Sequence, residues 1–171
     1  MSLYPAPRPM TLGMVPSGSP GVAETLKQMV KLTRTFRKDP GIRQLAASLV
    51  RDLPQYDTVG EIKALHAFVR DSIRYTNDIR NVELLQTPRA TLEMGVGDCD
   101  DKSTLLASLL ESIGRPSRFV AVAMKPSNAF THVYVETRLG PAGKWIPLET
   151  ILPKEAGWGP SNVTKRMVAH V

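Results

Sequence analysis

Apolar residues recur at every third or fourth position through the first part of the chain, which is the spacing of an amphipathic helix. The pattern predicts a helix over residues 22–36, a second, short helix over residues 42–51 and a third over residues 58–75. Thr58 and Glu61 have the spacing of a capping box, so we expect the third helix to begin at Thr58. This part of the chain is therefore predicted to be helical.

The fourth predicted helix is the best defined, because it has a start signal, an apolar face and a stop signal. Asp98 is a good N-cap residue, Asp101 occupies the third helical position, and Gly114 ends the helix. The apolar face consists of Leu105, Leu106, Leu109, Leu110 and Ile113. We expect a helix with such a face to pack into the protein core.

Beyond the fourth helix the periodicity changes to that of β-strands. Strands are predicted over residues 118–124, 132–137, 144–150 and 164–171, and the segment LGPAG at 139–143 is predicted to be a hairpin connection. Helices followed by antiparallel strands are typical of an α+β fold. We therefore expect N-terminal helices, with the fourth helix packed on an antiparallel β-sheet.

The length of 171 residues suits one domain with a short appendage. Residues 1–21 are rich in Pro, Gly and Ser and are predicted to form a flexible arm, in which residues 10–15 could add an edge strand. Residues 22–171 are predicted to form a single domain. Its parts are a helical segment over residues 22–52 and a core over residues 58–150.

Composition places the chain among globular proteins, with 42% apolar and 22% charged residues. No stretch approaches the roughly 20 continuous apolar residues that cross a bilayer, and the N-terminus lacks the apolar core of a secretory signal. A single cysteine excludes an intrachain disulfide and suits a reducing compartment. We therefore expect a cytoplasmic protein without a membrane span.

The net charge of +6 is unevenly distributed, because residues 1–52 carry eight Lys or Arg and three Asp or Glu. Four of the basic residues form a stripe beside the apolar face of the first helix: Lys27, Lys31, Arg34 and Lys38. Such a stripe is usually a solvated helix face, and it also suits contact with an acidic partner or a larger assembly. Nucleic acid is not the partner we expect.

Cys99 lies in the stretch GDCDDKST, in the first turn of the fourth predicted helix. The unpaired N–H groups and the positive dipole of a helix start favour a thiolate, and they can also stabilise the oxyanion of an acyl-transfer intermediate. The neighbouring Asp98, Asp100 and Asp101 act in the opposite direction, because nearby negative charge raises the pKa of a thiol. A reactive Cys99 would therefore need a cation beside it, for which an imidazolium is suitable.

The chain has three histidines, and their positions favour one of them as the partner of Cys99. His132 begins a predicted strand of the sheet that should pack against the cysteine helix, whereas we interpret His66 as a packing residue. Glu149 ends the adjacent predicted strand, where its carboxylate could orient the imidazole. We predict a nucleophile, a base and an orienting carboxylate in Cys99, His132 and Glu149.

Three segments in this order resemble the core of the transglutaminase-like superfamily of papain-like cysteine enzymes: GVGDCDDKSTLLASLLESIGRPSRFVAVA, THVYVE and KWIPLET. The resemblance covers residues 58–150 and implies a papain-like, transglutaminase-like core of a small microbial or phage-type member. By position it also assigns the nucleophile to Cys99, the base to His132 and the orienting carboxylate to Glu149. The family usually has Asp at the third position, so Glu149 keeps the charge but is one methylene longer.

The resemblance implies an oxyanion hole in which a side-chain donor adds to the N–H group of Cys99. Gln86 is the candidate by residue type and order, and capping of the local backbone is the alternative. Asp100 and Asp101 are candidates for binding the amine of a substrate, and a stabilising charge in the first helical turn is their alternative. The calcium dependence of the large, multidomain transglutaminases is not implied for a chain of this size.

Two other interpretations of Cys99 remain open, a buried structural thiol and a metal ligand. The stretch lacks the ligand spacing of a calcium loop and the paired ligand motifs of a structural zinc site, so we expect no metal and no cofactor. The sequence favours a cysteine-dependent hydrolase or acyltransferase for peptide or amide bonds, with hydrolysis favoured over cross-linking. The alternative is a non-catalytic binding or assembly module, such as a phage or prophage accessory protein.

Overall fold

The computed structural model describes residues 10–11, 18–77 and 84–171. The rest of the predicted arm, including residues 12–15 of its possible edge strand, lies outside the described residues. Residues 19–21, which we had assigned to the arm, form the first turn of a helix, because Pro20 suits the start of a helix. None of the described helices is long and apolar enough to cross a membrane.

The four predicted helices are present, with shifted ends. They are α1 (Ser19–Phe36), α2 (Pro40–Val50), α3 (Thr58–Ser72) and α5 (Cys99–Ser112). A further short helix, α4 (Pro88–Met94), precedes α5. The predicted capping box of α3 is wrong: the N-cap is Asp57, whose carboxylate accepts the N–H of Gly60 at 2.9 Å. Glu61 instead forms an ion pair with Arg115 at 2.5 Å, so its side chain is used in a tertiary contact.

The four strands predicted after α5 are confirmed and form one antiparallel sheet in the order β7-β6-β5-β8. They are β5 (Ser117–Met124), β6 (Phe130–Arg138), β7 (Trp145–Leu148) and β8 (Val163–His170). Two short pairs lie outside this sheet. β1 (Met10–Thr11) pairs with β3 (Leu84–Leu85), and β2 (Arg74–Tyr75) pairs in parallel with β4 (Val96–Gly97).

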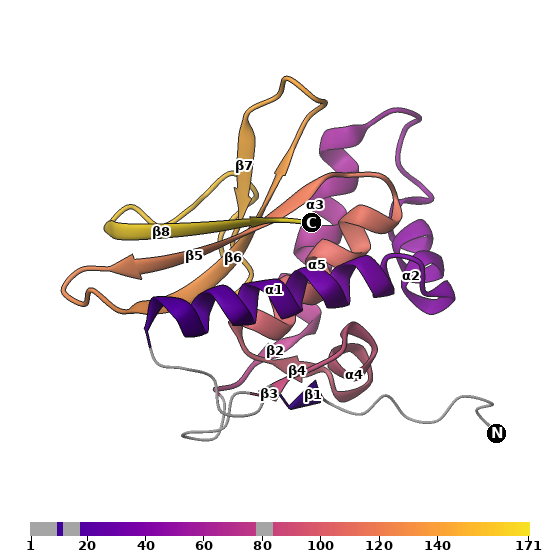
Figure 1. Cartoon of the computed structure of the whole chain (residues 1–171). Coiled ribbons are helices and arrows are strands. Elements are labelled where there is room, and N and C mark those ends of the chain that lie inside the picture. The colour runs from indigo at the N-terminus through magenta and orange to yellow at the C-terminus, as the bar shows by residue number, and fades with distance from the viewer. Residues whose placement is uncertain (1–9, 12–17, 78–83) are drawn as a thin grey trace.

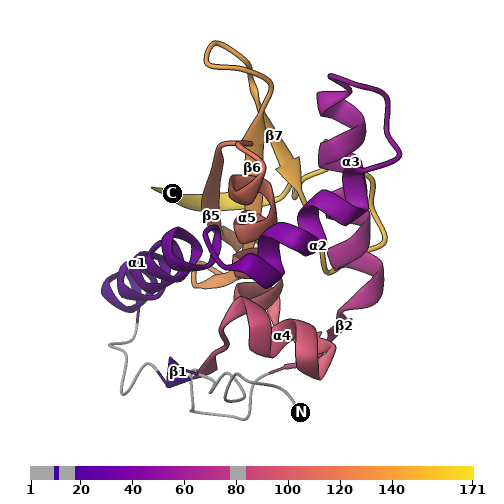
Figure 2. The same ribbon diagram turned by 90° about the vertical axis from the view of Figure 1, so that its right-hand side faces the viewer.

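The helices pack on one face of the sheet, where α5 lies against β5 and β6 and α1 also contacts β5 and β8 (Figures 1 and 2). Alternate strand residues, among them Phe119, Ala121, Val133 and Val135, join the core that α5 fills. Every residue of α5 from 101 to 110 is buried. This layering confirms the α+β prediction, in which the helix that begins at Cys99 packs on an antiparallel sheet.

The start of α5 is fixed from two directions. The Asp98 carboxylate accepts the N–H of Asp101 at 3.0 Å, and the Asp101 carboxylate accepts the N–H of Asp98 at 3.3 Å, which completes a capping box. Gly97 precedes this box, and a side chain there would lie 2.8 Å from the Cβ of Asp101. The Gly97 carbonyl accepts the N–H of Thr76 at 3.1 Å, so the turn that presents Cys99 is also held by the chain that follows α3.

Candidate active site

His132 and Glu149 meet across two neighbouring strands. His132 is near the start of β6, and Glu149 follows Leu148, the last residue of β7, which pairs with Val135. The Nε2–H of His132 donates to Oε2 of Glu149 at 2.5 Å, because a carboxylate can only accept. The predicted base and carboxylate are therefore in direct contact.

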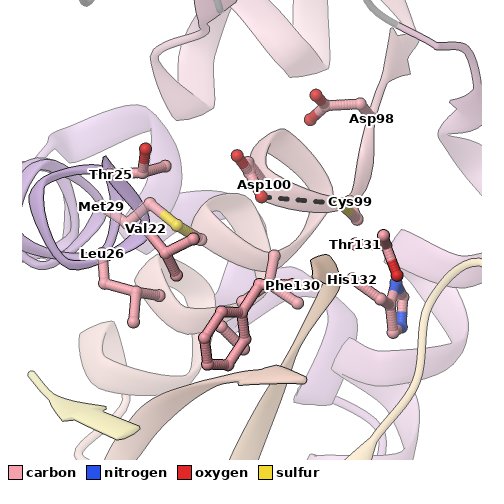
Figure 3. A pocket seen from close by; sticks show the side chains of 12 residues that line it. Val22, Thr25, Leu26, Met29, Asp98, Cys99, Asp100, Phe130, Thr131 and His132 are labelled. Atoms are coloured by element: carbon pink, nitrogen blue, oxygen red, sulfur yellow. Dashed lines mark hydrogen bonds between the residues drawn. The ribbon is translucent and has the colours of Figure 1, made fainter. Parts of the chain in front are cut away.

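Cys99 and His132 line one cavity of about 260 Å³ at the start of α5. Val22, Leu26 and Met29 of α1 form one side of it, Cys99 and His132 lie on the other, and Phe130 lies below them (Figure 3). Nε2 of His132 is occupied by Glu149, so Nδ1 is the ring nitrogen that can accept a proton from a thiol. The cavity offers a substrate access to a sulfur and an imidazole together.

Cys99 is half-buried, and its surroundings favour the neutral thiol. Burial raises the pKa of the Cys99 thiol far above its ordinary value, and the negative charges of Asp100 and Asp98 raise it further. A hydrogen bond from the backbone of Val133 acts in the opposite direction. The thiol donates to Oδ1 of Asp100 over 3.5 Å (Figure 3). Proton removal from Cys99 therefore needs a base.

Glu149 is held as a carboxylate although it is only 1% exposed. Burial by itself raises its pKa, but the hydrogen bond and charge of His132 and the backbone N–H groups of Ile151 and Leu152 together lower it below the usual value. Its Oε1 accepts the Ile151 N–H at 2.7 Å, while Oε2 accepts His132. The longer glutamate chain thus reaches two donors at once.

His66 is a second histidine at this site, and sequence reasoning missed its contact. It is buried on α3, and its Nε2–H donates to the backbone carbonyl of Glu149 at 2.5 Å. Burial lowers the pKa of His66, which favours the neutral imidazole. His66 packs in the core as expected, and it also fixes the main chain of Glu149.

Lys102 is a buried cation that sequence reasoning did not single out. Its Nζ donates to the carbonyl of Ile73 at 2.5 Å and to that of Arg70 at 3.2 Å, at the end of α3. Burial lowers the pKa of Lys102 to about 8. Because Lys102 is one turn after Cys99, it fixes the nucleophile helix against the helix that carries His66. The sequence signal for it is a lysine within the helix that is predicted to pack into the core.

The remaining candidate residues divide between the cavity and the interior. Asp100 lines the cavity, whereas Asp101 is 1% exposed and accepts the backbone N–H of Gln86 at 2.8 Å. This geometry favours a structural role for Asp101. The side-chain oxygen of Gln86 accepts the hydroxyl of Thr91 at 3.5 Å, and Gln86 is not among the residues that line the cavity. Its part in an oxyanion hole stays a prediction.

Known protein families and structures give an independent comparison. A family model described as the transglutaminase-like superfamily matches residues 43–150. Among curated proteins no relative is found. Solved structures share the fold at low sequence identity, and three of them illustrate the range of sizes in which it occurs.

A proposed protease from Parabacteroides distasonis has a TM-score of 0.57 at 14% identity, with 73% of this chain covering 26% of that one. A proposed cysteine protease from Cytophaga hutchinsonii has a TM-score of 0.53 at 14% identity, covering 91% of this chain and 59% of that one. Calcium-bound LapG from Legionella pneumophila has a TM-score of 0.54 at 18% identity, and the match covers 76% of this chain and 75% of that one.

The chain therefore spans about a quarter of the first structure and about three fifths of the second. The match to the family model includes Cys99, His132 and Glu149 and agrees with the resemblance seen over residues 58–150. The similar structures confirm the papain-like arrangement of a helix packed on an antiparallel sheet. The chain belongs to the transglutaminase-like superfamily.

Proposed function

We propose that this protein is a cysteine peptidase or amidase that acts through Cys99, His132 and Glu149. The observation that carries the proposal is the 2.5 Å contact of His132 Nε2 with Glu149, in a histidine that lines the same cavity as Cys99. A nucleophile and a base that line one accessible cavity, with an orienting carboxylate in contact with the base, suit acyl transfer. The descriptions of two similar structures as proposed proteases point to the same class.

In the first half of the proposed reaction, Cys99 attacks the carbonyl carbon of an amide or peptide bond. Nδ1 of His132 accepts the thiol proton as the S–C bond forms, and Glu149 stabilises the resulting imidazolium. The N–H groups at the start of α5 stabilise the oxyanion. The C–N bond then breaks, His132 returns the proton to the leaving nitrogen, and a thioester remains on Cys99.

In the second half, water attacks the thioester carbon and gives a proton to His132. The C–S bond breaks, the acid is released, and the sulfur of Cys99 takes the proton back. An amine in place of water would give transamidation through the same acyl-enzyme. We propose hydrolysis as the main outcome and a peptide or protein as the substrate. Asp100, at the cavity beside the sulfur, would attract a cationic group of that substrate.

The proposal is tested with a defined mixture of unblocked peptides, whose products are identified by mass spectrometry. Wild-type protein is expected to cleave some of the peptides, and Cys99→Ala is expected to cleave none. A labelled primary amine in the same mixture reports transamidation, which should be the minor product. Absence of cleavage, of amine incorporation and of any acyl adduct on Cys99 would contradict the proposal.

A second candidate function is a docking role, and the basic face of α1 favours it. Lys27, Lys31 and Arg34 of this helix and Lys38, which follows its end, line one hollowed surface. A cluster of four cations on one surface suits an acidic protein partner. Under this alternative, binding to such a partner persists in Cys99→Ala and weakens when Lys31 and Arg34 are replaced by Gln.

A further inference from the structure

A second cavity, of about 390 Å³, adjoins the candidate active site at His132. Thr131 and His132 line both cavities, whereas Cys99 lines only the first and Glu149 only the second. The imidazole of His132 therefore stands where the two cavities meet. A substrate that crosses His132 would place one part beside Cys99 and another part in the second cavity.

Apolar side chains dominate the wall of the second cavity. They are Met124, Ile151, Leu152, Trp158 and Pro160. Leu152 is 44% exposed, so its side chain is accessible to a group that enters this cavity. The composition of the wall suits an apolar side chain of moderate size.

The loop that forms this wall, residues 151–162 between β7 and β8, is tied to the sheet at several points. The Gly157 N–H donates to the carbonyl of Pro147 at 2.8 Å, and the Lys125 N–H donates to the carbonyl of Asn162 at 3.0 Å. Nζ of Lys154 lies 5.3 Å from the centre of the Trp158 ring. These contacts preform the cavity, so a ligand does not need to order the loop.

The chemistry of acyl transfer decides which part of a substrate enters which cavity. The acyl carbon becomes bonded to Cys99, so the acyl part stays in the first cavity. The leaving nitrogen receives its proton from His132, so this nitrogen lies on the imidazole side. The chain that continues from the nitrogen then extends past His132 into the cavity lined by Leu152 and Trp158.

We propose that the second cavity binds the side chain of the residue on the amine side of the scissile bond and selects an apolar one. This inference rests on the proposed function, because it assumes an acyl-enzyme on Cys99. It adds a substrate class, peptides with an apolar residue directly after the cleaved bond. It also adds Leu152 and Trp158 as residues that determine specificity.

The test measures the amine side alone, with the acyl group held constant. Cys99 is acylated by p-nitrophenyl acetate, and the acyl-enzyme partitions between water and an added amine, either leucinamide or glycinamide. The amine nitrogen attacks the thioester and passes a proton to His132, the C–S bond breaks, and Cys99 recovers the proton. Transfer to leucinamide is expected to exceed transfer to glycinamide by about tenfold or more at equal concentration of free amine.

Variants connect this preference to the cavity. Leu152→Ser, at an exposed position that should not impair folding, is expected to reduce the preference below about threefold. Trp158→Ala should have the same effect. Leu139→Ser is the matched control, because Leu139 is 40% exposed and lines neither cavity, and it should keep the wild-type preference.

The outcomes separate the two proposals. Equal transfer to both amides in wild type, or an unchanged preference in Leu152→Ser and Trp158→Ala, would overturn the inference while leaving the acyl-enzyme mechanism intact. Failure to form any acyl-enzyme, with no burst of p-nitrophenolate and no acetyl group on Cys99, would overturn the proposed function and the inference together.

Discussion

Replacing Glu149 by glutamine is expected to slow acylation of Cys99, because an amide cannot satisfy both groups that the carboxylate contacts. The carboxylate accepts the Nε2–H of His132 at 2.5 Å on one oxygen and the N–H of Ile151 at 2.7 Å on the other. An amide has one accepting oxygen, so its NH₂ group must face one of these two donors. With the oxygen on His132, the NH₂ group opposes the N–H of Ile151. With the NH₂ group on His132, Nε2 must accept and the ring proton moves to Nδ1, which can then no longer accept the thiol proton.

The magnitude follows from the hydrogen bond and the charge. A buried donor without an acceptor costs about 1–3 kcal/mol. An imidazolium and a carboxylate with charge centres about 4 Å apart attract each other by about 4 kcal/mol at an effective dielectric constant of about 20. The hydrogen-bond cost is present both before and during proton transfer, so the rate changes mainly through the lost charge attraction, of which we count about 2–4 kcal/mol. This loss lowers the acylation rate of Cys99 by about 30- to 1,000-fold in Glu149→Gln.

The assay is the burst of p-nitrophenolate released when p-nitrophenyl acetate acylates Cys99 at pH 7.5, followed by stopped-flow absorbance. Glu149→Asp keeps the charge but is shorter, and an intermediate rate is expected. Glu155→Gln is the matched control, because its side chain is 83% exposed and pairs with Arg70 at the surface. Circular dichroism reports folding of each variant. A folded Glu149→Gln protein that acylates within about threefold of wild type would refute this reasoning.

Three further predictions concern Lys102, His66 and Asp100. The pKa of Lys102 is lowered in the fold to about 8, so unfolding takes up a proton between pH 8 and about 10.5. The free energy of unfolding, measured with urea, should therefore rise in wild type relative to Lys102→Met, by at most about 2 kcal/mol from pH 8 to 9.5. A difference between the two proteins that does not change with pH would contradict this. His66→Leu should lose about 1–3 kcal/mol of unfolding free energy and slow the p-nitrophenolate burst. His66→Gln should recover part of both, since its amide can donate to the carbonyl of Glu149. Asp100→Asn should lower the pKa of Cys99 and speed its alkylation by iodoacetamide, because a negative charge beside the sulfur is removed, and slower alkylation would count against this.

The strongest sequence signals were local ones, and they predicted α5 and the sheet correctly. Asp98, Asp101 and Gly114 mark the ends of α5 within its own sequence, and the structure contains the capping box between Asp98 and Asp101. The alternation of the later strands likewise depends on neighbours along the chain. The pairing of β6 with β7 then brings His132 and Glu149 together, as the order of the motifs indicated.

The misses depend on contacts between distant segments. His66 contacts Glu149 across 83 residues of sequence, and Lys102 contacts Ile73 across 29, so no local pattern reveals either hydrogen bond. The cap of α3 was misassigned because Asp57 and Thr58 are adjacent residues that can both act as caps. With Asp57 as the N-cap, Gly60 occupies the third helical position, and Glu61 pairs with Arg115 instead.

The dependence of Cys99 on His132 is the central claim, and alkylation of the single cysteine by iodoacetamide tests it directly. Rates are measured from pH 5 to 9 in wild type and His132→Ala, with His170→Ala as the control at an exposed histidine. We predict fast alkylation of wild type at neutral pH and slow alkylation of His132→Ala until strongly alkaline pH. Equal rates in wild type and His132→Ala, both rising with the ordinary pKa of a thiol, would contradict the account.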